Sequence, residues 1–230
     1  TSMRTGSAAA LGVKTLARKN TKNLLILGAG MQAIYMLAAT LTAVPQIEKI
    51  RISDPLNYEN AVNFAGKSVE RLTNEFGIRN LDRIEFSAIK SLPEALSDTD
   101  AIITITRATA PAIKKEWVKR GTHFSCIGAD MVGKEEIDPE IFRDARAFAD
   151  DITQCTKFGE MQTPFKMGII TRESIAGELG DVLSGKTEGR RTDDEITVFD
   201  ATGLALLDLV TGKIAIDLAK EKGLGTIVNI

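Results

Sequence analysis

The chain of 230 residues has an ordinary globular composition, 43% hydrophobic and 26% charged, which is enough for one large domain or two small ones. A formal net charge of -2 at pH 7 gives no electrostatic case for nucleic acid or an anionic membrane as a partner, and no apolar run could span a bilayer. The two cysteines, Cys126 and Cys155, have neither a disulfide framework nor metal-ligand spacing. We expect them to be buried packing groups, with no metal site and a cytoplasmic location.

The first predicted element is a helix over residues 2–19, where Ala8, Leu11 and Leu16 recur at helical spacing. Arg4 lies near its start. An arginine beside helix amides could hold a carboxylate in a bidentate pair, although the spacing alone favours a solvated side chain.

The most informative stretch follows at residues 23–33, NLLILGAGMQA. An apolar strand over 24–27 ends in Gly28-Ala29-Gly30, and a helical pattern begins at Met31 and continues to residue 44. Gly28 permits a tight turn, and Gly30 leaves room for phosphates to reach bare backbone at a helix N-terminus. The pattern predicts dinucleotide binding. The alternative is a tight turn between strand and helix that binds nothing.

An acidic residue, Asp54, follows the second predicted strand over 49–53. A carboxylate in this position can accept hydrogen bonds from a ribose 2'-hydroxyl and repels a 2'-phosphate. The sequence therefore favours NAD over NADP, although Arg51 is close enough in sequence to act in the opposite sense.

The later elements alternate between helix and strand, which predicts an α/β fold: a Rossmann-type, doubly wound, mostly parallel sheet with helices on both faces. No linker divides residues 1–230 into two domains. The remaining predicted elements are a helix over 58–76, a strand over 83–87, a helix over 91–96, a strand over 101–106, a helix over 114–119, strands over 122–127 and 145–149, a helix-leaning stretch over 154–175, a helix over 177–185, a strand over 196–200 and a helix over 204–222.

Polar residues occur at or after several predicted strand ends, where the ligand crevice of such a fold lies. The hydroxyls of Thr104 and Thr106 could contact a cofactor, or these residues could be chosen for strand propensity. Asp130, with Lys134 nearby, could be a catalytic acid beside a cation, or part of an ordinary loop. The only histidine, His123, lies inside a predicted strand and is interpreted as structural.

Five stretches together resemble the ornithine cyclodeaminase/μ-crystallin family of NAD(P)-dependent proteins. They are TSMRTGSAAALGVKTLAR, LILGAGMQA, CIGADMVGKEEIDPE, GELGDVLSGKTEGR and DDEITVFDATGLALLDL, and they extend almost from the first residue to the last. The combination is far more specific than the glycine motif alone.

The resemblance implies roles by position. Arg4 would bind the substrate carboxylate and touch the cofactor, Asp130 would be the catalytic acid/base near the substrate amine, and Thr202 would contact substrate. The cofactor-binding residues would be Arg4, Gly28, Gly30, Met31, Gln32, Asp54, Thr106, Ile127, Gly128, Ala129, Lys134 and Ala201. Ala201 stands where cyclodeaminases carry serine, which weakens the specific ornithine interpretation.

Members of this family usually carry roughly a hundred further residues before the TxxRTG motif, forming a lobe that supplies the dimer interface and part of the substrate site. The resemblance therefore implies that residues 1–19 and 203–230 are helices that pack toward such a lobe. We expect something to precede Thr1 and a homodimer when that lobe is present.

The implied function is that of an NAD-dependent oxidoreductase or deaminase of the ornithine cyclodeaminase type, acting at the α-carbon of an amino acid through an imine. A ketimine or pyrroline-carboxylate reductase and an alanine dehydrogenase are alternatives that need the same residues, with an amino acid or cyclic imine as substrate. A further alternative is a ligand-binding protein like μ-crystallin with little turnover.

Overall fold

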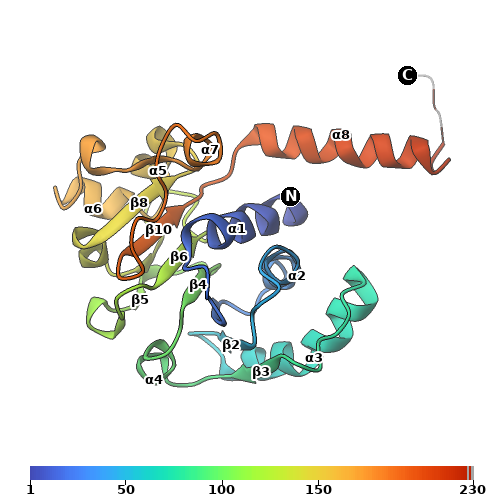
Figure 1. The fold of residues 1–230 in the computed structure, drawn as a ribbon, viewed down its shortest axis with the longest axis horizontal. Helices are drawn as coiled ribbons and strands as arrows, with labels where there is room; N and C mark the ends of the chain where they lie inside the picture. The colour runs from blue at the N-terminus through green and yellow to red at the C-terminus, as the bar shows by residue number, and fades with distance from the viewer. Residues whose placement is uncertain (227, 229–230) are drawn as a thin grey trace.

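A computed structural model of the chain describes residues 1–226 and 228. Within those residues, eight strands form one parallel sheet in the order β3-β2-β1-β4-β6-β10-β8-β9 (Figure 1). This confirms the predicted doubly wound α/β fold. The strands are β1 (Asn23–Leu27), β2 (Lys49–Ser53), β3 (Glu85–Ala88), β4 (Ala101–Thr104), β6 (His123–Cys126), β8 (Ala145–Ala149), β9 (Gly177–Glu178) and β10 (Ile196–Asp200).

The central strands bury both faces, as parallel strands covered by helices do. In β1, Leu24 and Ile26 face one hydrophobic core, whereas Leu25 and Leu27 face the other. This alternation explains why the strand reads as a continuous apolar run in the sequence.

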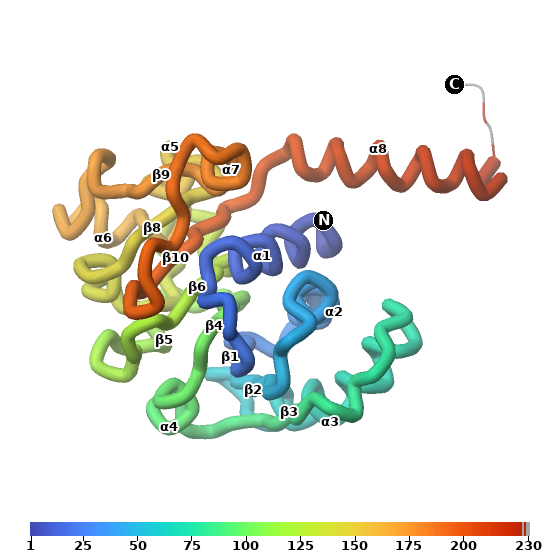
Figure 2. Tube along the Cα trace, in the orientation of Figure 1, coloured from blue at the N-terminus to red at the C-terminus, as the bar shows by residue number. Residues whose placement is uncertain are grey.

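Three helices cover the first face: α1 (Ser2–Leu16), α2 (Ala33–Ala43) and α3 (Tyr58–Phe76). Figure 2 shows α1 beside α2, and glycine makes the close packing possible. A Cβ on Gly6 would lie 2.5 Å from the carbonyl oxygen of Tyr35 in α2. Glycine also lets α1 pack closely on the sheet, because a Cβ on Gly12 would lie 2.5 Å from the ring of Phe199 in β10.

Shorter elements cover the second face, around a core that includes Leu96, Phe142 and Cys155. Two of them, β5 and β7, pair as a separate two-stranded parallel sheet that the sequence did not predict. The elements are α4 (Leu92–Leu96), β5 (Thr109–Ile113), η1 (Lys115–Trp117), β7 (Glu135–Ile137), η2 (Pro139–Arg143), α5 (Ile152–Phe158), α6 (Gln162–Lys166) and η3 (Arg172–Ser174), where η marks a 3-10 helix.

Several predicted boundaries were wrong for local reasons. The first helix ends at Leu16, not residue 19, because Ala17 is extended. The strand predicted over 101–106 ends at Thr104, and the helix predicted over 114–119 is only the 3-10 turn η1.

The helix predicted over 177–185 was wrong at its start. Gly177 and Glu178 are extended and pair with β8 as β9, and only Leu179–Leu183 forms the helix α7.

The last helix, α8 (Ala205–Glu221), projects away from the body of the molecule (Figure 1). Its bounds agree with the predicted 204–222, while residues 227, 229 and 230 of the predicted segment 203–230 lie outside the described residues. None of its residues is buried, and its exposed large apolar side chains are Leu206, Leu209, Val210, Ile214, Ile216 and Leu218. No helix among the described residues combines the length and apolar character needed to cross a membrane.

The strand register places the carboxyl ends of the strands in one row. Leu27 pairs with Ser53 and Thr104, Thr104 pairs with Cys126, and Cys126 pairs with Asp200. The residues that follow each strand therefore emerge at one edge of the sheet, where ligands bind in doubly wound folds.

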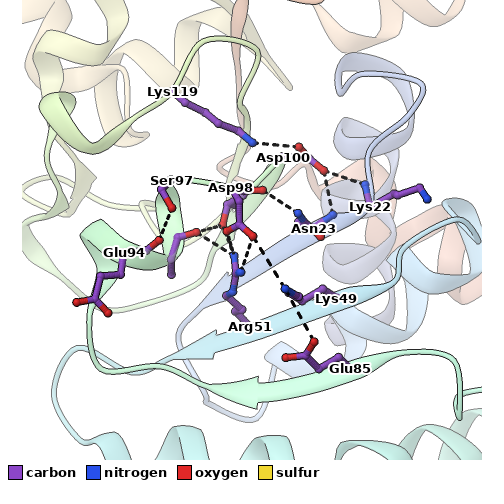
Figure 3. A network of polar contacts seen from close by, with 12 residues as sticks. Lys22, Asn23, Lys49, Arg51, Glu85, Glu94, Ser97, Asp98, Asp100 and Lys119 are labelled. Carbon is purple, nitrogen blue, oxygen red and sulfur yellow. Dashed lines mark hydrogen bonds and ion pairs between the residues drawn. The ribbon is translucent and has the colours of Figure 1, made fainter.

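The opposite edge is closed by ion pairs (Figure 3). Asp100 accepts hydrogen bonds from the backbone N–H groups of Lys22 and Asn23, both at 3.0 Å, and from the side chain of Lys119. Arg51 reaches toward this edge and pairs with Asp98, with Nη1 2.5 Å from the carboxylate. These contacts lower the pKa values of Asp98 and Asp100, despite the partial burial of Asp100.

The close approach at Gly12 gives a stability prediction. Gly12→Ala should destabilise the protein by about 1–3 kcal/mol, because the added methyl group would overlap the Phe199 ring inside the core. Gly66→Ala in α3 is the matched control, because a Cβ there meets nothing within 4 Å. It should stabilise by about 0.5–1 kcal/mol through helix propensity. Urea unfolding of both variants tests this, and equal effects would contradict it.

Candidate functional site

A cleft of about 340 Å³ opens at the carboxyl edge of the sheet. Most of the predicted site residues line it, although Gly28, Asp54 and Ala129 do not. The lining residues are Thr1, Arg4, Thr5, Gly30, Met31, Gln32, Ala33, Ile105, Thr106, Arg107, Ile127, Gly128, Asp130, Lys134, Ala201 and Thr202.

The glycine turn after β1 has the geometry that its sequence predicted. Gly28 has a φ of +115°, and a Cβ there would lie 2.5 Å from the carbonyl oxygen of Ile105, so no other residue fits without displacement. In contrast, a Cβ on Gly30 would meet no protein atom within 4 Å. Gly30 therefore leaves open space in the cleft, where a ligand can approach the backbone.

Backbone donors line this part of the cleft. Helix α2 begins at Ala33, two residues later than the predicted Met31. Within the described chain, no hydrogen bond uses the backbone N–H groups of Gly30, Met31 and Gln32. The side-chain oxygen Oε1 of Gln32 is also buried without a partner there. Unpaired N–H groups at a helix N-terminus form a site for an anion such as phosphate.

Asp54 lies directly after β2, as predicted, but its carboxylate is held by the chain that follows. Its Oδ1 accepts from the backbone N–H groups of Leu56 (3.0 Å) and Asn57 (3.2 Å), and its Oδ2 accepts from Asn60. Contact with a ribose remains a prediction. The competing influence of Arg51 is removed, because its guanidinium is paired with Asp98 near the opposite edge.

Arg4 is not solvated, contrary to what its spacing alone favoured. Only 17% of its side chain is exposed, and its Nε lies 3.3 Å from Oδ2 of Asp208 in α8. The guanidinium packs on Gly203, where a Cβ would lie 2.6 Å from Nη1. The remaining N–H groups of the fork can still serve a carboxylate in the cleft.

Across the same cleft, Asp130 and Lys134 form an ion pair. Lys134 Nζ lies 2.5 Å from Asp130 Oδ1 and donates to the carbonyl of Gly128 at 3.2 Å. The side chain of Asp130 is half exposed, whereas that of Lys134 is largely covered. A solvent-accessible carboxylate held by a covered ammonium group is therefore available to a substrate in the cleft.

The sequence left open whether Thr104 and Thr106 contact a cofactor or only favour a strand. The structure separates the two residues, because only Thr106 lines the cleft. Thr104 is fully buried and its hydroxyl donates to Glu136 at 2.5 Å, so it does not line the cleft. Thr106 does line it, but its hydroxyl also donates to Glu136, at 2.7 Å. Glu136, from the unpredicted strand β7, is thus a residue at the site that sequence reasoning missed. The charged run KEEID gave no sign of burial.

The turn after β10 completes the cleft. Ala201 and Thr202 line it, and the backbone N–H of Gly203 donates to Asp150 at 2.7 Å. Ala129 is fully buried beside the cleft. Arg107 is a second lining residue that the sequence did not identify, and it has no ion pair within the described residues.

Three carboxyl groups are buried beneath the cleft: Glu136, Glu160 and Asp200. Burial raises the pKa of all three, to about 8 for Asp200. The pKa of Glu160 is raised further by its neighbour Glu136. We place the proton of this pair on Glu160, since Glu136 accepts hydrogen bonds from four donors.

His123 and the two cysteines are buried, as expected of structural residues. His123 is fully buried in β6 between the hydroxyls of Thr197 (2.9 Å) and Ser125 (3.0 Å), and burial holds its pKa well below the usual value. Cys126 and Cys155 are buried free thiols whose pKa values are raised by burial. No group of three or more potential ligands for a metal ion occurs within the part of the chain that the structure describes.

The sequence is similar to proteins of a known family. The sequence model of the Ornithine cyclodeaminase/mu-crystallin family matches residues 1–223. Alanine dehydrogenase from Archaeoglobus fulgidus is 35% identical over 226 residues, which cover 98% of this chain and 66% of that protein.

Two solved structures match the fold closely. Iminosuccinate reductase of Paracoccus denitrificans in complex with NAD+ has a TM-score of 0.88 and 33% identity, covering 100% of this chain and 66% of that one. Delta(1)-pyrroline-2-carboxylate reductase of Thermococcus litoralis, in complex with NADH and L-proline, has a TM-score of 0.87 and 35% identity, covering 99% of this chain and 67% of that one. The chain thus spans about two thirds of the length of these relatives.

The buried acids predict how stability depends on pH. Folded Asp200 has a pKa of about 8, above its ordinary value of 3.8, so the folded protein holds a proton that the unfolded chain releases. Stability is therefore fully present below the unfolded pKa and is lost as pH rises toward about 8, by about 1.4 kcal/mol per pH unit for this group. Urea unfolding at several pH values from mildly acidic to neutral measures the slope.

Asp200→Asn should flatten that slope, because the side-chain oxygen can still accept from Met161 but the group no longer titrates. Asp144→Asn is the control, because the pKa of this exposed carboxyl is lowered by Lys115 and it does not titrate in the same range. An unchanged slope in Asp200→Asn would mean that the folded protein holds Asp200 ionised.

Proposed function

Because the chain belongs to the ornithine cyclodeaminase/mu-crystallin family, we propose that it is an NAD-dependent oxidoreductase acting at the α-carbon of an amino acid or on the corresponding imine. The observation that carries the proposal is one cleft that joins an anion-binding turn at Gly30 to Arg4 and the Asp130–Lys134 pair.

The cleft fits a dinucleotide at its glycine turn. The unpaired N–H groups of Gly30, Met31 and Gln32 would receive the pyrophosphate, and the open space at Gly30 allows its approach. Asp54 would hold the ribose on the β2 side. On the other side of the turn, Thr106, Ile127, Gly128 and Ala201 would flank the nicotinamide ring, which when bound supplies the hydride acceptor or donor.

The chain's own side chains would orient the substrate and manage its protons. Arg4 would bind the substrate carboxylate with the N–H groups not directed at Asp208. Asp130 would accept a proton from the substrate amine or return it to the imine nitrogen, and Lys134 would hold its carboxylate in place. Thr202 lies in the same cleft and would contact the substrate.

Among the reactions of this class, we favour imine reduction and its reverse, amino-acid oxidation, over cyclodeamination. The relatives compared above are a dehydrogenase and two reductases, and Ala201 lacks the serine hydroxyl that the resemblance associates with cyclodeaminases. A protein that only binds ligand has no evident need for both Arg4 and Asp130. Ammonia release from ornithine or lysine without net change in NADH would identify a cyclodeaminase instead.

We further propose that the exposed helix α8 and the α1–α2 face are covered in the working protein by the part of the relatives that this chain does not span. An apolar groove of about 370 Å³ lies between α1 and α2, lined by Met3, Leu11, Tyr35 and Phe76 among others. Exposed apolar side chains gathered on one helix and beside a groove are typical of an interface, and a homodimer built through that part is the expected assembly. Light scattering on the longer polypeptide would measure it.

Cofactor choice can be tested on the 230-residue chain by calorimetric titration with NADH and NADPH. NADH should bind more tightly. Asp54→Asn should reduce the preference by about tenfold, because it removes the charge that repels a 2'-phosphate, while the amide oxygen can still accept from Leu56 and Asn57. Asp82→Asn, an exposed change before β3, is the control. Binding of neither nucleotide would overturn the proposed function.

The acid/base assignment predicts that Asp130→Asn lowers kcat by about 100-fold or more in the complete protein, because the amide cannot exchange a proton with the amine. The affinity for NADH should change little. The exposed Val132→Ala, in the same loop, should retain turnover. The assay follows the absorbance of the reduced nicotinamide with amino acids and cyclic imines, and normal turnover by Asp130→Asn would exclude its role as acid/base.

A further inference from the structure

We propose that Glu136 is a positioning residue whose buried carboxylate sets the spacing of the two loops around the nicotinamide half of the cleft. The inference rests on the proposed function, since it concerns how the same cleft receives its cofactor. Glu136 itself does not line the cleft and would not touch cofactor or substrate.

The carboxylate of Glu136 joins the segments after β4 and β6. Its Oε1 accepts from the backbone N–H of Thr106 at 2.6 Å and from the Thr106 hydroxyl at 2.7 Å. Its Oε2 accepts from the Thr104 hydroxyl at 2.5 Å and from the backbone N–H of Gly128 at 2.9 Å. One rigid group therefore fixes two backbone segments, and Thr106 and Gly128 each line the cleft on their other side.

A carboxylate accepts all four contacts, two at each oxygen. The two backbone N–H groups can donate but not accept, and they approach different oxygens of Glu136. A glutamine amide would present its NH2 group to one of them and leave that N–H buried without a partner. The contact at Gly128 is also as close as packing allows, because a Cβ there would lie 2.5 Å from the Glu136 carboxylate.

A second buried acid holds Glu136 from behind. Glu160 Oε1 accepts from the backbone N–H groups of Glu136 and Ile137, both at 2.8 Å. The other oxygen of Glu160 is buried and has no partner within the described residues. Strand β7 is thus anchored at its backbone, and the Glu136 side chain is directed at the two loops from a fixed position.

The order of the strands in the sheet indicates which half of a bound cofactor Glu136 would support. Strand β2, which ends before Asp54, lies on one side of β1, and strands β4 and β6 lie on the other. A dinucleotide with its pyrophosphate at the turn after β1 places its adenosine toward Asp54 and its nicotinamide over β4 and β6. Glu136 therefore supports the nicotinamide side and makes no contact with the adenosine side.

The test compares two nucleotides on Glu136→Gln. Affinity for NADH should fall about tenfold or more, because one backbone N–H beside the cleft loses its partner and the loops shift. Affinity for ADP, which lacks the nicotinamide half, should stay within about twofold of the wild type. A role confined to general stability would not separate the two nucleotides at a temperature well below unfolding, so their affinity ratio is the diagnostic quantity.

Two further variants complete the design. Thr104→Val removes one hydroxyl donor to Glu136 without changing the lining of the cleft, and should weaken NADH binding a fewfold with ADP unaffected. It keeps the inference testable if Glu136→Gln fails to fold. Glu160→Gln is the matched control, because an amide oxygen can still accept from Glu136 and Ile137, and both affinities should remain near wild type.

The outcomes separate this inference from the proposed function. Wild-type protein that binds neither nucleotide would overturn the proposed function itself. Wild-type protein that binds both would leave that function standing. In that case, equal losses or no losses for NADH and ADP in Glu136→Gln and Thr104→Val would overturn the positioning role.

Discussion

The cleft depends on the register of the parallel sheet. Because Leu27, Thr104, Cys126 and Asp200 align across neighbouring strands, the segments that follow them leave the sheet at one edge. Those segments carry the glycine turn, the threonine loop, the Asp130 loop and the turn at Gly203. A shift of one residue in any strand would exchange its core-facing side chains between the two faces, so the cores that stabilise the sheet also keep this edge aligned.

Burial of charge distinguishes the two edges. At the edge opposite the cleft, Asp98 and Asp100 pair with arginine or lysine, and Asp98 remains partly exposed to solvent. Beneath the cleft, Glu136 and Glu160 are fully buried and are held by backbone N–H groups and hydroxyls rather than by cations. Fixed dipoles of this kind satisfy a carboxylate without using the cations of the cleft, so Arg4 pairs with Asp208 in α8 and Lys134 pairs with Asp130. As a consequence, the stability of the folded protein depends on pH, because buried acids favour the protonated form.

The sequence predicted the features that depend on local spacing. These features are the turn from Gly28 to Gly30, the doubly wound parallel sheet and the acid after β2. Each follows from a short sequence pattern with a physical reason at every position. Glu136 and the β5–β7 pair could not be predicted, because their role depends on a contact with segments that are about 30 residues earlier in the chain. The same is true of Arg4, whose partner Asp208 lies at the far end of the sequence.

The pairing of Arg4 with Asp208 connects the cleft to the projecting helix. Arg4 lies over Gly203, just before α8, and Asp208 lies in the first turn of that helix. The position of the guanidinium in the cleft is therefore tied to the direction in which α8 leaves the sheet. Since α8 buries none of its own residues, little within the described chain fixes that direction beyond its first turn. If α8 is covered as proposed, that contact would also settle the geometry of Arg4, so the proposed substrate binding and the proposed assembly would share one structural element.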